Sequence, residues 1–308
     1  MKNRLPSLLA VTLAFVFVLV VWGGVVRLSG SGLAIPDWPL AEGKLLPRAH
    51  PNVLIEYAHR AIAGIVAILT VWACIAVFRD ARWRSKLGAL AVAALVTLAL
   101  QVFMGARVVL EELPVDRVVA HLLLAFIFFG ILVRMALLAR DESHRGVGSD
   151  VLSSPGSPAG APSAAAIPHH GLSRWAAVAA AGVFVQAGFG AWVSSSGAAL
   201  ACPDFPTCHG QWFPKLEGLV GIQFTHRLGA YAVSLIILAL LFVAAPRSLP
   251  ARARWPLRIS GILLAMQFTL GVMNVLLQVP LPVSAAHLGT ALILFGTLIL
   301  ASHELSRA

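Results

Sequence analysis

Apolar residues in this chain form long runs that are separated by short polar segments. Eight runs are long enough to cross a bilayer as helices, because one span needs roughly 20 apolar residues. Their expected limits are 7–28, 53–78, 87–107, 116–138, 173–195, 219–245, 256–278 and 284–302. This pattern predicts an all-α membrane protein with eight transmembrane helices.

The composition agrees with this prediction. Of the 308 residues, 59% are apolar and 12% are charged, whereas a soluble protein carries roughly 25% charged residues. The net charge of +10 would also suit an anionic partner, but basic residues placed in cytoplasmic loops produce the same excess. The chain contains no basic cluster typical of nucleic-acid binding, so we expect a lipid bilayer and no nucleic acid as its surroundings.

Basic residues are concentrated before the first span and in every second connection. The positive-inside rule places these segments in the cytoplasm. We therefore expect a multi-pass protein of the inner (plasma) membrane with both termini cytoplasmic. The first run is too long for a signal peptide and no small-residue cleavage site follows it, so we expect it to be retained. The basic residues are Lys2, Arg4, Arg79, Arg82, Arg84, Lys86, Arg134, Arg140, Arg145, Arg174, Arg247, Arg252, Arg254 and Arg258.

One long polar stretch interrupts the chain. Residues 141–172 are rich in Gly, Ser, Pro and Ala, which is typical of a flexible linker. The stretch separates residues 1–140 from residues 173–308, and each of these parts contains four of the expected spans. The sequence therefore predicts two four-helix units joined by a cytoplasmic linker.

The two units are related in sequence. Residues 36–39 (Pro-Asp-Trp-Pro) correspond to residues 203–206 (Pro-Asp-Phe-Pro), and His59 corresponds to His226 at the same offset of 167 (226 − 59). Two units of the same orientation are expected to be related by a pseudo-twofold axis along the membrane normal. The later hairpins correspond at an offset of 166 (287 − 121), and their matched pairs are Gln101 and Gln267, Gly105 and Gly271, and His121 and His287.

Four histidines occupy corresponding places near the outer ends of the even-numbered spans, at a depth of roughly 8–11 Å. Each unit thereby brings two imidazoles from two helices to one level, as axial ligation of a haem iron requires. A zinc site would need four ligands together, and copper would favour Met or Cys nearby. The pattern predicts haem, with polar groups satisfied by neighbouring helices as the alternative. The histidines are His59, His121, His226 and His287.

Two further groups of residues suit a haem. Glycines in the odd-numbered spans allow either a flat macrocycle or another helix to approach closely. Arginines near the outer ends of spans are suited to haem propionates, or else extend to the membrane interface. The glycines are Gly23, Gly24, Gly105, Gly188, Gly190 and Gly271, and the arginines are Arg27, Arg60, Arg107 and Arg227.

The units differ at one position beside these histidines. Glu56 precedes His59 by three residues, on the same helix face, and Gln223 holds the corresponding place. A carboxylate can accept and release protons, whereas an amide cannot. This difference favours chemistry in the first unit and a permanently held cofactor in the second. A structural pairing of Glu56 with Arg60 is the alternative.

The cysteines indicate one stapled loop. Cys202 and Cys208 lie in an expected outer loop, on the oxidising side of the membrane, and we expect a disulfide between them. Ile35 and Ala41 hold the corresponding positions in the first unit, so only one loop can be stapled. Cys74 lies inside a span and is expected to pack as a small apolar residue.

Together these segments resemble the haem A synthase family. The resemblance rests on the four histidines and on the Gly-Ser-Gly-Leu and Pro-Asp-Trp-Pro motifs of the first outer loop. It also rests on residues 56–60 (Glu-Tyr-Ala-His-Arg) and 202–208 (Cys-Pro-Asp-Phe-Pro-Thr-Cys). It covers nearly the whole chain except residues 141–172. It implies an oxidoreductase that converts the C8 methyl group of haem O to a formyl group by successive hydroxylation, giving haem A for cytochrome c oxidase.

The resemblance also implies roles for particular residues. His59 and His121 would hold the substrate haem O, His226 and His287 would ligate a permanent haem b, and Glu56 matches a functionally important glutamate of the family. The implied partners are the enzyme that produces haem O and an external electron donor such as a ferredoxin, and a homo-oligomer is also considered. Some members carry a cysteine pair in the first outer loop, which this chain lacks.

Two other classes of protein compete with this interpretation. A membrane di-haem b cytochrome that only transfers electrons needs the same four histidines. Such a carrier has no need of Glu56, however, and would be expected to have two equivalent sites. A transporter with parallel repeats would place polar groups near the bilayer midplane, whereas here they cluster near the outer surface. The sequence therefore favours the enzyme.

Overall fold

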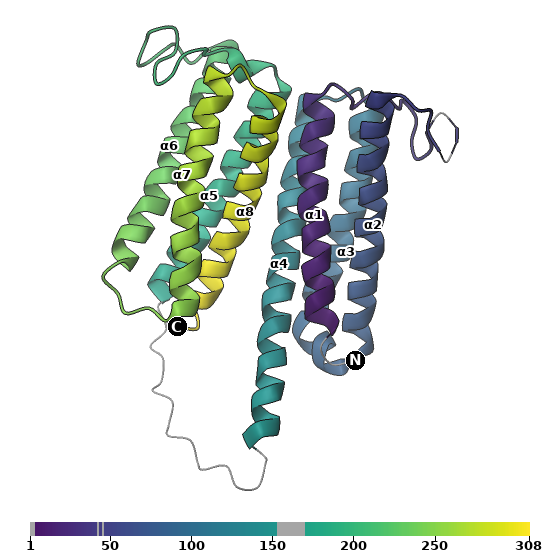
Figure 1. The fold of residues 1–308 in the computed structure, drawn as a ribbon, viewed down its shortest axis with the longest axis vertical. Helices are drawn as coiled ribbons and strands as arrows, with labels where there is room; N and C mark the ends of the chain where they lie inside the picture. The colour runs from purple at the N-terminus through teal and green to yellow at the C-terminus, as the bar shows by residue number, and fades with distance from the viewer. Residues whose placement is uncertain (1–3, 42, 45, 153–169) are drawn as a thin grey trace.

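The computed structural model describes residues 4–41, 43–44, 46–152 and 170–308. The described chain forms long helices that run side by side in two groups (Figure 1). All eight long helices have the length and hydropathy of membrane spans, which confirms the predicted all-α membrane protein. The elements are α1 (Arg4–Leu28), α2 (Pro51–Arg79), α3 (Ala81–Leu110), α4 (Val115–Leu152), α5 (His170–Ser195), the short 3-10 helix η1 (Ala198–Leu200), α6 (Gly218–Ala244), α7 (Ala251–Leu276) and α8 (Leu281–Leu305).

Within each group the helices pack as a ring in chain order. α1 packs on α2, α2 on α3, α3 on α4 and α4 on α1, and α5 to α8 repeat this arrangement. α2 and α4 therefore lie diagonally across the first bundle, and α6 and α8 lie diagonally across the second. The two helices of each unit that carry a predicted histidine face each other across the interior of a bundle.

The two bundles meet through α1, α4, α5 and α8 (Figure 1). In this interface two phenylalanine rings lie against glycines of the opposite bundle. A Cβ added at Gly296 would lie 2.9 Å from the ring of Phe129, and a Cβ added at Gly130 would lie 3.3 Å from the ring of Phe295. The two contacts are equivalent by the internal repeat, because Phe129 corresponds to Phe295 and Gly130 corresponds to Gly296 at the offset of 166. The packing is consistent with the expected pseudo-twofold axis.

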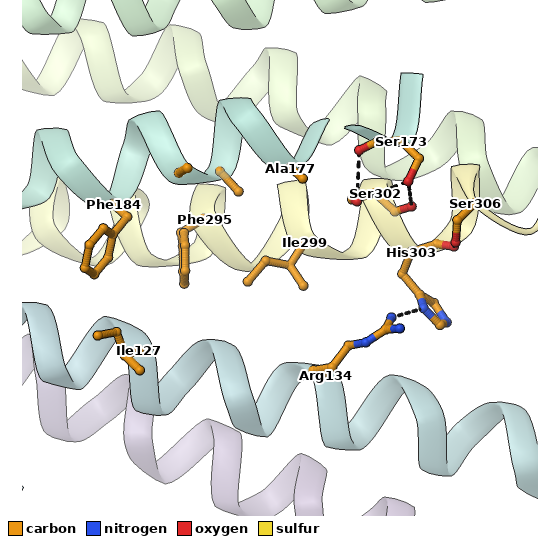
Figure 2. Close-up of a pocket in the computed structure, with 12 residues that line it drawn as sticks. Ile127, Arg134, Ser173, Ala177, Phe184, Phe295, Ile299, Ser302, His303 and Ser306 are labelled. Atoms are coloured by element: carbon orange, nitrogen blue, oxygen red, sulfur yellow. Dashed lines mark hydrogen bonds between the residues drawn. The ribbon is translucent and has the colours of Figure 1, made fainter. Parts of the chain in front are cut away.

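The two ends of the bundles differ in character. At one end, here called the loop end, lie the long connections 29–50 and 196–217. Both chain termini lie at the opposite end, here called the terminal end (Figure 1). Between the bundles, near the terminal end, α4, α5 and α8 enclose a groove of about 640 Å³. Phe184, Phe295 and Ile127 line its apolar part, and Arg134 and His303 lie near its polar end (Figure 2).

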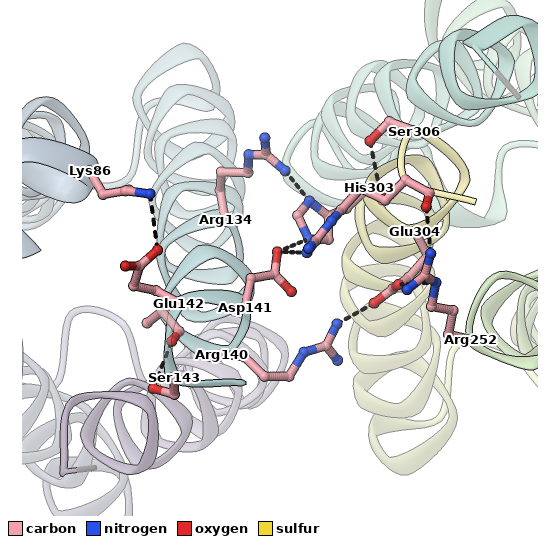
Figure 3. A network of polar contacts seen from close by, with 12 residues as sticks. Lys86, Arg134, Arg140, Asp141, Glu142, Ser143, Arg252, His303, Glu304 and Ser306 are labelled. Carbon is pink, nitrogen blue, oxygen red and sulfur yellow. Dashed lines mark hydrogen bonds and ion pairs between the residues drawn. The ribbon is translucent and has the colours of Figure 1, made fainter. Parts of the chain in front are cut away.

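Polar residues at the terminal end connect α4 to α8 (Figure 3). Nε2 of His303 lies 2.8 Å from the carboxylate of Asp141, and Nδ1 of the same ring contacts Arg134. Arg140 forms an ion pair with Glu304, which is 4% exposed. These contacts hold residues 134–141 of α4 against α8 of the second bundle.

The boundaries of the expected linker need correction. α4 continues to Leu152 and α5 begins at His170, so the first part of the stretch 141–172 is helical. At the start of this stretch the polar residues have partners in other helices: Asp141 pairs with His303 of α8, and Glu142 pairs with Lys86 of α3 at 3.0 Å. Residues 153–169 of the expected linker lie outside the described residues.

Candidate functional site

The structure brings the four histidines together in two pairs near the loop end. His59 of α2 and His121 of α4 are close enough for their charges to interact. His226 of α6 and His287 of α8 form the corresponding pair. Each pair therefore lies between the two diagonal helices of one bundle.

Each of these imidazoles lies against a glycine of the preceding odd-numbered helix. A Cβ atom added at the glycine would lie between 3.0 and 3.3 Å from Cε1 of the ring. Because that separation is shorter than an ordinary van der Waals contact, a larger residue would push the ring out of place. The four pairs are Gly23 with His59, Gly105 with His121, Gly190 with His226, and Gly271 with His287.

The other two predicted glycines serve helix packing between the bundles. A Cβ added at Gly24 would lie 2.8 Å from Leu288 of α8, and one added at Gly188 would lie 3.2 Å from Leu123 of α4. Of the two roles that the sequence left open, close approach of another helix applies at these positions.

Glutamines contact two histidines of the second bundle. Nε2 of Gln186 lies 2.9 Å from Nδ1 of His226 and donates to the backbone oxygen of the same residue at 2.7 Å. Nε2 of Gln267 lies 3.2 Å from Nε2 of His287. In the sequence Gln267 stands out only as a marker of the repeat, and Gln186 does not stand out at all. A glutamine four residues before a glycine is the signal that would have found both.

His121 of the first bundle has the same kind of partner. With its amide turned so that both ends are satisfied, Gln101 lies 2.8 Å from Nδ1 of His121 and accepts a hydrogen bond from the Ala125 N–H at 2.8 Å. The fourth histidine differs. Nδ1 of His59 is buried and has no hydrogen-bond partner among the described residues.

This set of donors fits a haem iron. Each bundle offers two partly buried imidazoles from diagonal helices, which is the arrangement that bis-histidine ligation uses. Nδ1 of His287, like that of His59, is buried without a partner in the described part of the chain. No cluster of three or more His, Cys, Asp or Glu residues with metal-binding geometry occurs in the ranges that the structure describes, so the arrangement does not resemble a structural zinc site.

Arg60 holds the first long loop against α2. Its Nη1 donates to the backbone oxygens of Asp37 at 2.8 Å and Leu40 at 3.1 Å, and its Nη2 donates to that of Ile35 at 2.9 Å. The loop 29–50 is therefore fastened one residue away from His59.

Arg227 holds the second long loop in the same way. Its Nη1 donates to the backbone oxygen of Thr207 at 2.8 Å, and its Nη2 donates to that of Cys202 at 2.7 Å. These carbonyl groups correspond to those of Leu40 and Ile35 at the offset of 167. The two loops thus share one anchoring scheme.

An aspartate shapes each of these loops from within. Asp37 accepts a hydrogen bond from the Gly43 N–H at 2.8 Å, and Asp204 accepts the corresponding bond from the Gly210 N–H at 2.9 Å. The hydroxyl group of Thr207 also donates to Asp204. That hydroxyl group, followed by the Gly210 N–H, lowers the pKa of the Asp204 carboxyl.

The predicted disulfide between Cys202 and Cys208 is present. In the first loop the corresponding residues, Ile35 and Ala41, are buried and pack with Val53. Apolar contact therefore takes the place of the covalent bond in the first loop.

Glu56 is held from two sides. It is 3% exposed, its Oε1 lies 2.6 Å from Nη2 of Arg60, and its Oε2 accepts a hydrogen bond from the Ile35 N–H at 2.9 Å. The pairing with Arg60 that the sequence left open as an alternative is thus formed. At the corresponding place Gln223 donates to the backbone oxygen of Ala199 at 3.2 Å.

The second unit shows that loop anchoring does not need a carboxylate. Arg227 makes two of the three carbonyl contacts that Arg60 makes, although an amide, Gln223, lies in the place of Glu56. The carboxylate of Glu56 itself contacts loop 29–50 through the Ile35 N–H, whereas the second loop has the Cys202–Cys208 disulfide.

The remaining predicted arginines also contact protein groups. Arg27 donates to the backbone oxygen of Ser194 and lies 3.3 Å from the hydroxyl group of Ser195, both in α5. Arg107 forms an ion pair with Glu111 at the end of α3. Haem-propionate binding by Arg27, Arg60, Arg107 and Arg227 stays a prediction, and in this structure protein groups hold all four guanidinium groups.

The fold and these sites define a class: a polytopic membrane protein with two helical bundles, each suited to bis-histidine ligation of haem. A family model described as cytochrome oxidase assembly protein matches residues 7–299. The chain therefore belongs to the cytochrome oxidase assembly protein family.

Several relatives resemble the chain over most of its length. The heme A synthase of Symbiobacterium thermophilum is 32% identical over 290 residues, which cover 89% of each chain. The heme A synthase of Alkalihalophilus pseudofirmus is 26% identical over 302 residues, covering 97% of this chain and 96% of the relative. The heme A synthase of Shewanella oneidensis is 27% identical over 347 residues, covering 96% and 95%.

Proposed function

We propose that this protein is a haem A synthase, which oxidises the C8 methyl group of haem O to a formyl group and supplies haem A to cytochrome c oxidase. One observation carries the proposal: both bundles contain a partly buried histidine pair, but among the described residues only the first pair has a carboxylate, the buried Glu56, one helical turn from a histidine. Similarity over nearly the full chain to relatives named heme A synthase supports it.

In this proposal the first bundle binds the substrate and the second bundle binds a permanent cofactor. His59 and His121 hold the substrate haem O in the first bundle, and His226 and His287 ligate a resident haem b in the second. The haem b supplies electron transfer between an external donor, such as a ferredoxin, and the first bundle. The enzyme that produces haem O delivers the substrate.

The chain's own residues position the substrate and handle protons. Gly23 and Gly105 leave room for the two imidazoles to keep their orientation. Arg60 fastens loop 29–50 beside His59 and holds the Glu56 carboxylate in place. Glu56 exchanges the protons that methyl-group oxidation requires, at the carboxylate oxygen that Arg60 orients.

The proposed orientation follows from the distribution of charge. The basic residues of the terminal end face the cytoplasm, so both termini are cytoplasmic and the loop end faces outward from the inner membrane. The Cys202–Cys208 disulfide lies at the loop end, which suits the oxidising side.

The proposal is tested by expression in cells that make haem O, followed by extraction and mass analysis of the haems. We expect haem A and hydroxylated haem O with the parent chain, and neither product with a His59→Ala variant. Unchanged haem O together with bound haem b would overturn the proposal and leave the di-haem electron carrier. Cysteine labelling from each side of the membrane tests the orientation.

A further inference from the structure

Three of the four histidine sites share a glutamine that the fourth site lacks. In α3, α5 and α7 a glutamine lies four residues before the glycine that contacts the imidazole, so both residues fall on one helix face. In α1 the residue four positions before Gly23 is Leu19. The three complete pairs are Gln101 with Gly105, Gln186 with Gly190, and Gln267 with Gly271.

The glutamine gives its histidine a second fixed contact. Gln186 touches both the ring nitrogen and the backbone oxygen of His226, so it restrains the ring and the helix turn together. An amide suits either form of the imidazole, because its oxygen accepts from a protonated nitrogen and its N–H donates to a deprotonated one. Hydrogen bonds to the free ring nitrogen orient a ligating histidine and strengthen its bond to the metal.

His59 has no such restraint. Leu19 has an apolar side chain, so only its backbone can interact polarly with the ring of His59. Nδ1 of His59 makes no hydrogen bond of normal geometry to any described residue. Nδ1 of His287 makes none either, but Gln267 contacts that ring at Nε2. Gly23 still fits the ring as closely as in the other three sites, with a distance of 3.0 Å between an added Cβ and Cε1. The site is therefore complete in shape but lacks one hydrogen bond.

We propose that Gln101, Gln186 and Gln267 are positioning residues for their histidines, and that Leu19 makes His59 the releasable ligand of the first bundle. This inference rests on the proposed function. A permanently bound cofactor needs two restrained ligands, and His226 and His287 each contact a glutamine. A substrate that leaves as product needs one ligand that lets go, and His59 is that ligand.

The difference between His59 and His121 also indicates the side of the first bundle on which haem enters and leaves. His121 keeps the contact with Gln101, so the substrate remains attached through α4 while the bond on the α2 side opens. α2 is also the helix that carries Glu56 and Arg60 and that fastens loop 29–50. Loosening on that side would let haem pass without disturbing the α3–α4 hairpin.

The decisive experiment adds the missing amide. Leu19→Gln is compared with Leu19→Met, an apolar control of similar size, in the full-length protein purified with bound haem. Haem release is followed by transfer to an excess of apomyoglobin, and a His287→Ala background assigns the first-bundle rate. We expect Leu19→Gln to slow release from the first bundle about tenfold, with a change in the electron paramagnetic resonance signal of that haem. Leu19→Met should leave both unchanged.

The reciprocal change is Gln186→Leu, which gives the second bundle the residue that α1 carries naturally. We expect release of its haem to become about tenfold faster and its reduction potential to shift, without a change in helix content. Equal release rates for Leu19→Gln, Leu19→Met and the parent chain would overturn the inference. Release is measured with haem b and does not depend on haem O conversion. Failure of the proposed function would instead appear as normal haem binding without conversion.

Discussion

Glu56 and Arg60 form an ion pair one helical turn apart, with 2.6 Å between Oε1 and Nη2. Arg227, the counterpart of Arg60, fastens its own loop beside an amide instead of a carboxylate. The carbonyl contacts shared by Arg60 and Arg227 therefore do not require the ion pair, whereas Glu56 adds a hydrogen bond to the Ile35 N–H of the first loop. A substitution at Glu56 tests whether this residue acts as a loop anchor or in the chemistry.

The first prediction follows from this comparison. A Glu56→Gln substitution reproduces the residue of the second unit, so loop 29–50 and the bound haem should be retained. Haem O conversion should fall by at least about a hundredfold, because general acid–base groups contribute roughly that much. Extracted haems are quantified by mass, and the thermal unfolding midpoint and haem content serve as controls.

Two other results would change the role that we give to Glu56. Conversion at the parental rate would make it a loop anchor only. Loss of conversion together with loss of haem and a lower unfolding midpoint would show that the first loop depends on the ion pair in a way that the second does not. The Gln223→Glu variant is the matched control and should leave conversion unchanged.

The second prediction concerns the glycines that touch the histidines. A Gly190→Ala substitution places a methyl group 3.3 Å from Cε1 of His226, so the ring must move, at a cost of about 1–3 kcal/mol. We expect the variant to lose most of the haem in the second bundle, measured as Soret absorbance per protein. Gly64→Ala in α2 is the control, because an added Cβ there meets nothing within 4 Å. Equal haem content in the two variants would contradict the prediction.

The third prediction concerns the two outer loops. Replacing Cys202 and Cys208 by serine should lower stability by about 2 kcal/mol, since a disulfide that closes a short loop contributes roughly that amount. Differential scanning calorimetry in detergent measures the effect.

Because the loops share their anchoring, Ile35→Cys combined with Ala41→Cys should form a second disulfide. Alkylation without prior reduction, followed by mass analysis, detects it, and free thiols in the double variant would show that the loops differ in backbone geometry.

The fourth prediction concerns acid. Hydrogen bonds from Thr207 and Gly210 lower the pKa of the Asp204 carboxyl in the folded loop, so the ionised form favours the fold. This contribution is present above the unfolded pKa of about 3.9 and is lost as the pH falls below that value toward the folded pKa. Hydrogen exchange at the Gly210 N–H should therefore accelerate below about pH 4 relative to the general acid dependence. An Asp204→Asn variant should exchange faster already at neutral pH and show no such transition.

Much of the fold could be predicted because membranes constrain sequence strongly. Each apolar run became one helix, and the histidines stood out because buried imidazoles are rare in lipid. The end of α4 could not be predicted in this way. Residues 141–152 look like linker by composition, and at their start Asp141 and Glu142 have partners on other helices that the sequence does not reveal.

The candidate site was predicted in part. The spacing of the repeat related His59 to His226, and the position of Cys202 and Cys208 in one outer loop predicted their disulfide. The roles of Arg60 and Arg227 were not visible, because their partners are backbone carbonyl groups and any residue carries one. The contact of Gln186 with His226 depends on how α5 and α6 are rotated against each other. The repeat did not reveal it either, because the residue that corresponds to Gln186 in the first unit is Leu19.

The contacts between Phe129 and Gly296 and between Phe295 and Gly130 have a consequence beyond packing. An interface in which each side presents the same aromatic residue and the same glycine is isologous, the kind that two identical subunits form. A four-helix protein carrying one such surface would dimerise through it, and the present chain has the organisation of that dimer after gene fusion. The two halves, expressed as separate polypeptides, should accordingly assemble again in one membrane.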